Sequence, residues 1–339
     1  LVGRYQLYDT SRPQGEWQVN PEAPYSTQLS NADGMPFPST PVLHKNSSYS
    51  AGKGILPGNY QIRGLTLYEE KTAKVSDYKQ VKNYALGLFR WNEGQISNVD
   101  FYDVKVEGQN YVGTVCGVNL GSISRIAVKR SEEMSAMTQN ELAEASYVNG
   151  LQFVGGITGG DLFLLDTDKV DETYLTTDGR GQQLKGYIQL HNEVPVTGNS
   201  YVGGIIGASC FGNDKLTAAG SVIQECTNKG SVTGYLGKKK TSVYLGGIVG
   251  YSYGASLRNC ESTLGNKDFY AMETSDFAGE DDFVGDYMGG IVGYGTAGST
   301  LENCTTKGGT LKGHKYVGGI AGYLEYDASM GNMILDGKG

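Results

Sequence analysis

The stretch Tyr244-Leu245-Gly246-Gly247-Ile248-Val249-Gly250 decides the fold, because the chain repeats it with small changes. The phrase begins with an aromatic residue, usually continues through a pair of glycines to Ile or Val, and ends on a third glycine. Six copies begin at Tyr111, Phe153, Tyr201, Tyr244, Tyr287 and Tyr316, and a degenerate seventh begins at Tyr84. Repeats at intervals of about 27 to about 48 residues indicate supersecondary units stacked on one another.

Each unit is expected to contain three short strands with glycine at the corners. The phrase supplies the first strand, a second follows as at Leu257–Cys260, and a third precedes the next phrase as at Gly230–Gly234. Such a coil cannot bury its apolar residues alone, so each must lie under its counterpart in the next coil. The sequence therefore predicts an all-β fold, a right-handed parallel β-helix of glycine-rich repeats with loop insertions.

Matching positions of the repeat predict the core. Val115, Ile157, Ile205, Ile248, Ile291 and Ile320 should form one buried column, with neighbours about 4.8 Å apart. The second glycine of each pair should tolerate no large residue, which applies to Gly204, Gly247, Gly290 and Gly319. In the first copy Thr114 replaces this glycine, so that unit is expected to be distorted.

The cysteines also repeat. Cys226, Cys260 and Cys304 occupy matching places, so stacking would make them an internal column of unpaired thiols that pack as small apolar groups. Five cysteines without a C-x-x-C pair predict neither a zinc site nor a complete set of disulfides.

The repeat phrases resemble the glycine-rich GLUG motif, which occurs in surface and secreted bacterial proteins, including adhesin-like ones and some immunoglobulin-A peptidases. The resemblance covers about residues 59–323, and Gly58–Leu67 is similar to the coil that introduces such arrays. It implies a scaffold or adhesive surface at the cell exterior. In that family the peptidase chemistry lies in separate domains, which these repeats do not contain.

The repeats divide the chain into three parts. Residues 1–57 lack the phrase and are rich in proline, so they are expected to form an irregular entry segment that caps the array. Residues 58–323 form the array, and residues 324–339 a closing segment with a strand at Met333–Leu335. One helix is expected, at Ser131–Ser146, where Thr138 and Glu141 have the spacing of a capping box.

Composition narrows the class of partner. The net charge of −8 disfavours nucleic acid, because binding to phosphate needs a basic face. We see no apolar stretch of about 18 residues that could span a bilayer. The start at Leu1 is compatible with a removed targeting or membrane-anchoring segment, and we expect an extracellular or cell-surface location.

Catalytic motifs match only on paper. Gly250–Gly254 fits G-x-S-x-G and Gly293–Gly298 fits G-x-G-x-x-G, but both need a following helix that the repeat does not predict. His44, His191 and His314 are isolated and interpreted as surface residues. The sequence thus predicts no catalytic residue, no cofactor and no metal site.

Acidic loops leave two questions open. Asp281 and Asp282 are the best carboxylate pair for a polysaccharide-cleaving β-helix enzyme, yet they lie in a connector and are interpreted as solvated. Whether the loops Asp166–Glu172 and Glu280–Asp282 bind calcium is not decided by the sequence, although the first lacks the glycine and final glutamate of an EF-hand.

One repeated position suggests a surface. The residue after the phrase is Tyr251, Tyr294 and Tyr323 in the last three full coils, which predicts a tyrosine ladder that either binds a ligand or packs against a neighbouring insertion. The function predicted is a non-enzymatic, adhesin-like scaffold for an extracellular saccharide or a host or neighbour-cell protein. The alternative is a carbohydrate-active β-helix enzyme, a lyase or glycoside hydrolase.

Overall fold

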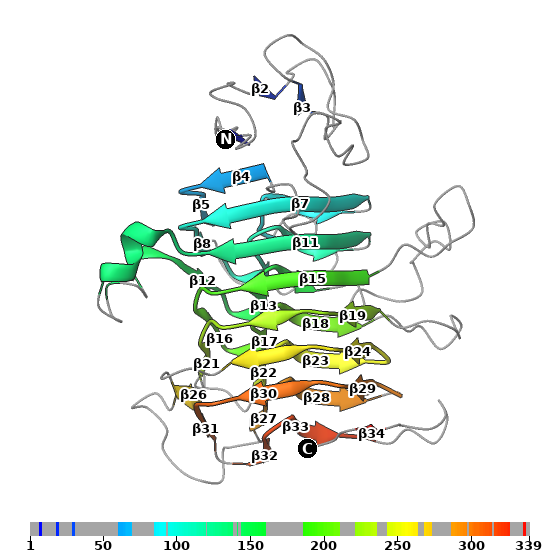
Figure 1. Ribbon diagram of the computed structural model, residues 1–339. Helices are drawn as coiled ribbons and strands as arrows, with labels where there is room; N and C mark the ends of the chain where they lie inside the picture. The colour runs from blue at the N-terminus through cyan, green and yellow to red at the C-terminus, as the bar shows by residue number, and fades with distance from the viewer. Residues whose placement is uncertain are drawn as a thin grey trace, which may run out of the picture.

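The computed structural model is a tall stack of β-coils, with the early coils at one end and the late coils at the other (Figure 1). It describes residues 7–8, 18–19, 29–30, 60–69, 85–92, 94–119, 121–137, 141, 144–160, 186–210, 221–235, 243–263, 268–272, 286–296, 298–313, 315–325 and 335–336. The strands of neighbouring coils pair in parallel, as β11 with β7 and β15. This all-β arrangement of stacked parallel sheets is compatible with the predicted β-helix.

Four sheets run along the stack, and the chain visits them in turn. Sheet 1 contains β1 (Leu7–Tyr8), β4 (Tyr60–Arg63), β7 (Gln95–Tyr102), β11 (Ser122–Lys129), β15 (Gly186–Asn192), β19 (Val222–Gln224), β20 (Thr227–Asn228), β24 (Ser256–Arg258), β25 (Glu261–Thr263), β29 (Thr300–Glu302), β30 (Thr305–Lys307) and β34 (Leu335–Asp336). Sheet 2 contains β5 (Thr66–Tyr68), β8 (Lys105–Glu107), β12 (Tyr147–Asn149), β16 (Val196–Gly198), β21 (Val232–Tyr235), β26 (Asp268–Met272) and β31 (Thr310–Lys312).

The repeat phrase supplies the other two sheets. Sheet 3 contains β9 (Asn110–Val112), β13 (Gln152–Gly155), β17 (Ser200–Gly203), β22 (Val243–Gly246), β27 (Asp286–Gly289) and β32 (Val317–Gly318). Sheet 4 contains β6 (Phe89–Asn92), β10 (Cys116–Asn119), β14 (Thr158–Gly160), β18 (Ile206–Cys210), β23 (Val249–Tyr253), β28 (Val292–Thr296) and β33 (Ala321–Leu324). The prediction of one strand per phrase was therefore wrong, because the chain turns at the glycine pair and the phrase forms two strands.

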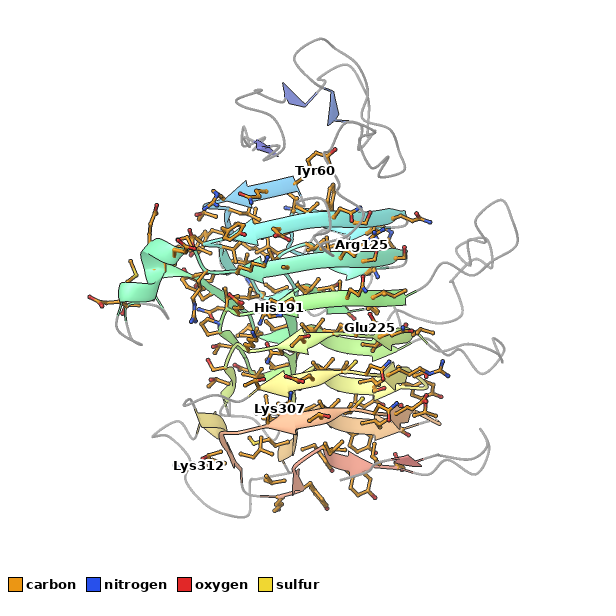
Figure 2. All side chains as sticks on the ribbon, viewed as in Figure 1. Tyr60, Arg125, His191, Glu225, Lys307 and Lys312 are labelled. Atoms are coloured by element: carbon orange, nitrogen blue, oxygen red, sulfur yellow. The ribbon has the colours of Figure 1, made fainter. Side chains whose placement is uncertain are left out.

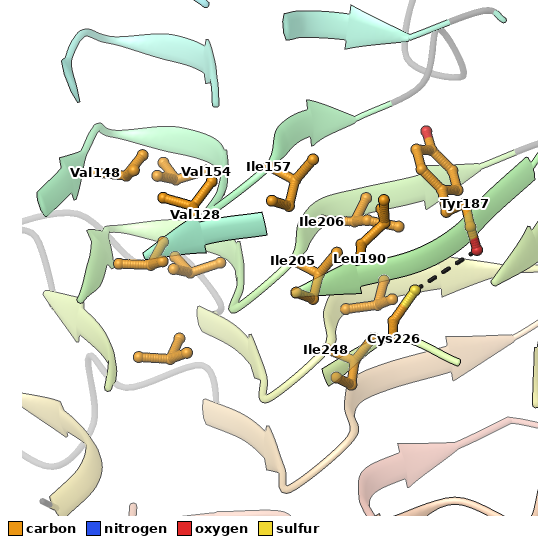
Figure 3. Close-up of a cluster of buried hydrophobic side chains, with 14 of the residues drawn as sticks. Val128, Val148, Val154, Ile157, Tyr187, Leu190, Ile205, Ile206, Cys226 and Ile248 are labelled. Carbon is orange, nitrogen blue, oxygen red and sulfur yellow. Dashed lines mark hydrogen bonds between the residues drawn. The ribbon is translucent and has the colours of Figure 1, made fainter. Parts of the chain in front are cut away.

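The core column lies where the repeat predicted. Val115, Ile157, Ile205, Ile248 and Ile291 are fully buried, and Ile320 in the last coil is partly buried. Backbone N–H groups of each coil donate to the same column in the next, for example Ile205 to Ile248 at 3.1 Å and Ile248 to Ile291 at 2.9 Å. Figure 3 shows Ile157, Ile205 and Ile248 in succession inside the stack. The column is thus in register along the array.

The second glycine of the pair makes room for a polar column on sheet 1. A Cβ at Gly204 would lie 2.2 Å from the carbonyl oxygen of Gly247 and 2.3 Å from Cγ of Asn228. The polar column consists of Asn192, Asn228, Ser262 and Thr306, which pair in register. In the coil of the first repeat phrase, the residue paired with Asn192 is the apolar Val128. Thr114 replaces the second glycine there and is buried. The coil is not distorted as predicted, since Cys116 keeps its register with Phe89 and Thr158.

Gly319 corrects one prediction. A Cβ placed there meets nothing within 4 Å, whereas the same addition at Gly247 or Gly290 would lie about 2 Å from backbone oxygen. The difference follows from position, because Gly319 lies in the last coil and no described strand of sheets 3 or 4 stacks beyond it.

The thiol column is confirmed as unpaired. Cys226 and Cys260 are buried, Cys304 is half-buried, and all three are free. Each thiol donates to a carbonyl of the preceding coil, as Cys226 does to Tyr187 at 3.6 Å (Figure 3). The residue before each cysteine has a left-handed backbone with φ between 52° and 54°, namely Glu225, Asn259 and Asn303. Residues in the same register of β7, β11 and β15 share this conformation, namely Asn98, Arg125 and Gln189, so the local bend recurs along sheet 1.

The segments outside the array are described only in part. Of the predicted cap, β1 pairs antiparallel with β4, β2 (Gln18–Val19) pairs with β3 (Leu29–Ser30), and the rest lies outside the described residues. The closing strand is β34, which pairs with β29; Met333 lies outside the described residues. The predicted helix is a 3-10 helix, η2 (Glu132–Ala136), followed by helical residues at 141, 144 and 145; it projects from the stack (Figure 1). Thr138 is not among the described residues.

One connector between repeat phrases contains a strand. The sequence predicts a loop insertion at 262–285, yet β26 at Asp268–Met272 pairs with β21 and β31 in sheet 2. The strand sequence Asp-Phe-Tyr-Ala-Met lacks the Val-Thr-Gly of β16 and β21, so the repeat pattern does not predict it.

Candidate functional site

The predicted tyrosine ladder forms, and it is one of two aromatic rows. Tyr251, Tyr294 and Tyr323 occupy paired positions of β23, β28 and β33. Their rings stack at centroid distances of 5.5 Å and 5.3 Å with interplanar angles of 4° and 19°. We call these three residues row 2.

Row 1 was not recognised from the sequence, although its residues begin the repeat phrases. Consecutive rings of this row stack at centroid distances from 4.5 Å to 5.2 Å, and its members are Tyr111, Phe153, Tyr201, Tyr244, Tyr287 and Tyr316. The signal that could have found it was the aromatic first letter of every copy. Three of these tyrosines and Phe153 have left-handed backbone angles, with φ from 52° to 56°.

The two rows interlock edge to face. Tyr294 lies 5.6 Å from Tyr244 and 5.0 Å from Tyr287, and the six contacts between the rows have interplanar angles from 72° to 89°. The strand spacing of about 4.8 Å is wider than the contact distance of about 3.5–4.0 Å between flat rings. Rings must therefore tilt by about 40° to touch their neighbours, and opposite tilts in the two rows give the near-perpendicular angles.

Exposure of the rings increases toward the last coil. Tyr111 and Phe153 are buried in a small cluster with Ala85, Val118 and Ala208, whereas Tyr201, Tyr244 and Tyr287 are half-buried. Tyr316 and Tyr323 are exposed, at 47% and 39%. The accessible part, here called the tyrosine surface, comprises Tyr244, Tyr251, Tyr287, Tyr294, Tyr316 and Tyr323.

A carboxylate lies beside the tyrosine surface. The hydroxyl of Tyr294 donates to Glu325, and the hydroxyl of Thr296 donates to the same carboxylate at 3.2 Å. Partial burial and then the hydrogen bond to Glu325 raise the pKa of Tyr294 above the usual range. The phenol is thus held in its neutral form and acts as a donor.

The catalytic motifs that match on paper do not assemble a catalytic site. Strand β23 covers Gly250–Tyr253, and the hydroxyl of Ser252 is buried and hydrogen bonded to Ser299 at 2.9 Å. Strand β28 covers most of Gly293–Gly298, and strand β29 follows it, so no helix N-terminus is available to a phosphate.

His191 differs from the interpretation as an isolated surface residue. Its side chain is 23% exposed, and its Nε2 lies 2.8 Å from a carboxylate oxygen of Glu193. The hydrogen bond between them lowers the pKa of the Glu193 carboxyl. The other two histidines, the acidic loop at 166–172 and the pair Asp281 and Asp282 lie outside the described residues.

A second repeated surface lies on sheet 1 and carries mixed charge. Its exposed ion pairs join successive coils, as Arg258 to Glu302 at 3.2 Å and Lys307 to Glu261 at 2.6 Å. Figure 2 shows Arg125 and Glu225 on this side of the stack. Because the described charges on this face are paired with the opposite sign across coils, it is a weaker candidate for a charged ligand.

Within the ranges given above, no three or more His, Cys, Asp or Glu side chains gather where they could hold a metal ion. Among the described helical segments, none is long and apolar enough to cross a membrane.

Comparison with known proteins supports the repeat. No curated protein matches the chain. A solved structure with some similarity is that of "a putative immunoglobulin A1 protease from Bacteroides ovatus", at 16% identity and a TM-score of 0.44, over 78% of this chain and 67% of that one. The family model of the GLUG motif matches residues 241–264, from the start of β22 through β25. The resemblance drawn from the sequence is confirmed there, and residues 241–264 are a GLUG motif.

Proposed function

We propose that this chain is a non-enzymatic, extracellular, adhesin-like scaffold, a right-handed β-solenoid whose tyrosine surface binds a saccharide or a protein. The observation that supports this proposal is the tyrosine surface itself, where six rings from three coils lie together and become more exposed toward the last coil. Tyrosine combines an apolar ring with a polar tip and is enriched at binding surfaces. Right-handed turns are the rule for parallel crossovers.

Rigidity favours such a role. The rings sit on strands that are paired on both sides, except in the last coil, and each ring is held by stacked and edge-on neighbours. A ligand that binds there does not have to order the side chains first, which lowers the cost of binding. Several weak contacts on one rigid face can then add to a useful affinity.

Replacement of Tyr251, Tyr294 and Tyr323 by alanine tests the proposal. Adhesion to glycan-coated and protein-coated surfaces should fall to background, because the row-2 rings are lost. These rings also pack on row 1, so a second variant with leucine at the three positions preserves apolar packing and controls for the fold. Circular dichroism and thermal unfolding establish that both variants fold. Wild-type adhesion by a folded leucine variant would refute the site.

The enzyme alternative has its own test. The purified protein is screened for cleavage of neutral and acidic polysaccharides, alongside a variant with Asp281→Asn and Asp282→Asn. We expect no cleavage by either protein. Cleavage by the wild type that is lost in the variant would establish a carbohydrate-active enzyme instead.

A further inference from the structure

The central rings of the tyrosine surface do not offer free faces. Tyr294 has Tyr251 against one face and Tyr323 against the other, at centroid distances of 5.5 Å and 5.3 Å. Tyr287 is enclosed in the same way by Tyr244 and Tyr316, at 5.2 Å and 4.7 Å. A sugar ring therefore cannot stack on these tyrosines, although stacking is the usual role of an aromatic residue in a flat binding site.

Because the faces of the central rings are covered, a ligand can reach only their outer edges and hydroxyl groups. The hydroxyl is the atom of a tyrosine farthest from the backbone, and both central residues remain half-buried rather than buried. The surface therefore presents phenol groups repeated from coil to coil, at the strand spacing of about 4.8 Å. A ligand that matches this pattern needs hydrogen-bonding groups repeated along its length.

The sheet topology argues against a polypeptide ligand. An extended peptide binds a sheet by adding a strand to an open edge. Strands β27 and β28 are interior, since β27 lies between β22 and β32, and β28 between β23 and β33. Their backbone groups are already paired, so a peptide would have to rely on side chains alone. A polysaccharide carries hydroxyl groups along its whole length and needs no open edge.

Charge argues against an acidic polymer. The exposed carboxylate of Glu325 accepts hydrogen bonds from Tyr294 and Thr296 at the tyrosine surface, and the chain has a net charge of −8. An anionic polysaccharide would be repelled both by the nearby carboxylate and by the protein as a whole. An uncharged chain escapes both effects.

We propose that the tyrosine surface binds an uncharged polysaccharide lengthwise along the stack, through hydrogen bonds with the phenol hydroxyls rather than by stacking on ring faces. This inference rests on the proposed function and names the ligand class and the contact that it uses. The hydroxyl groups of Tyr251, Tyr294 and Tyr323 contribute to affinity, that of Tyr294 as an acceptor because its proton is donated to Glu325, and their rings serve mainly to hold them in place.

The test is a matched pair of triple variants at Tyr251, Tyr294 and Tyr323, one with phenylalanine and one with leucine. Phenylalanine removes only the hydroxyl groups and keeps the stacked rings. Binding is measured by affinity electrophoresis in gels containing dextran, galactomannan or xylan as neutral polymers, alginate as an acidic one, and gelatin as a polypeptide. Tyr111→Phe is the control, because it removes a hydroxyl from the buried end of row 1, where Phe153 already occupies the next rung.

We expect the wild type and Tyr111→Phe to be retarded by at least one neutral polymer and not by alginate or gelatin. Loss of each hydroxyl should weaken binding by about 2- to 10-fold, so the phenylalanine variant should bind at least about tenfold more weakly. Full retention by the phenylalanine variant with loss in the leucine variant would keep the site and overturn the inference. Wild-type binding by both variants would refute the proposed function as well. Retardation by alginate or gelatin alone would overturn the ligand class.

Discussion

Alanine at Gly247 and at Gly319 should have opposite effects, although the two glycines occupy the same place in the repeat. A Cβ at Gly247 would lie 2.0 Å from the carbonyl oxygen of Gly290 and 2.2 Å from Oγ of Ser262. A Cβ at Gly319 meets nothing within 4 Å. Neither glycine has a positive φ, so the comparison isolates space from backbone strain.

The magnitude at Gly247 follows from what must move. An oxygen at 2.0 Å must retreat by more than 1 Å to reach an ordinary contact distance of about 3.5 Å, and it belongs to the backbone of the next coil. That movement strains two backbone hydrogen bonds, from the N–H of Gly247 to the carbonyl of Gly289 at 3.1 Å and from the N–H of Ile248 to the carbonyl of Ile291 at 2.9 Å. Overpacking costs about 1–3 kcal/mol and each weakened backbone bond about 0.5–1.5 kcal/mol. With one overpacked contact and two weakened hydrogen bonds, we expect Gly247→Ala to cost about 2–6 kcal/mol.

Gly319→Ala should leave stability unchanged or raise it by up to about 1 kcal/mol, since alanine restricts the unfolded chain. Urea denaturation followed by circular dichroism measures both variants against the wild type. Similar losses at the two glycines would show that the space around this position does not depend on a following coil, and would refute the stacking argument.

Two further predictions concern the interior. Asn228→Ala should cost about 2–4 kcal/mol, because the Asn228 side chain accepts from Asn192 at 3.0 Å and donates to the carbonyl of Gly230 at 2.9 Å inside the stack. The surface control Arg258→Ala should cost less than about 1 kcal/mol, and equal losses in urea denaturation would contradict the ranking. Hydrogen bonding with Cys226 and burial raise the pKa of the Cys260 thiol in the folded protein. The neutral thiol therefore stabilises the fold at pH values below its unfolded pKa of about 8.5, and this stabilisation is lost as the pH rises above that value. The free energy of unfolding should therefore fall more steeply between pH 8 and pH 10 in the wild type than in Cys260→Ala, and parallel pH profiles would refute this. Cys226 and Cys260 should react with a thiol reagent only after unfolding, and rapid labelling of the folded protein would contradict their burial.

The sequence was sufficient to locate the isoleucine and cysteine columns, which repeat in register. Apolar and glycine positions recur because each coil imposes the same contacts on the next, so the isoleucine and cysteine columns could be located without coordinates. The number of strands could not be predicted from the sequence, because the phrase has the pattern of one apolar strand. In the structure Gly246 and Gly247 allow the chain to turn within the phrase. The turn depends on close backbone contacts between coils, which no local pattern records.

The candidate site was only half predictable for a related reason. Tyr251, Tyr294 and Tyr323 were found as a repeated surface position, but their role depends on row 1, which begins seven residues earlier in each phrase. That separation places the two rows on different strands, so their edge-on contact is visible only once the chain has turned. Stacking within each row covers the faces of the central rings, which the sequence alone would offer to a ligand.

Exposure along row 1 rises over the same coils in which the paired position of sheet 4 changes to tyrosine. In the early coils the residues in the register of row 2 are Val118, Gly160 and Ala208, and the row-1 rings Tyr111 and Phe153 are buried in one cluster with Val118 and Ala208. Tyr201 is already half-buried, and from Tyr251 onward the same register carries tyrosine. Two accessible rows of rings therefore lie together only in the last three coils. Binding should accordingly be confined to the last three coils, even though the aromatic row extends through all six copies of the phrase.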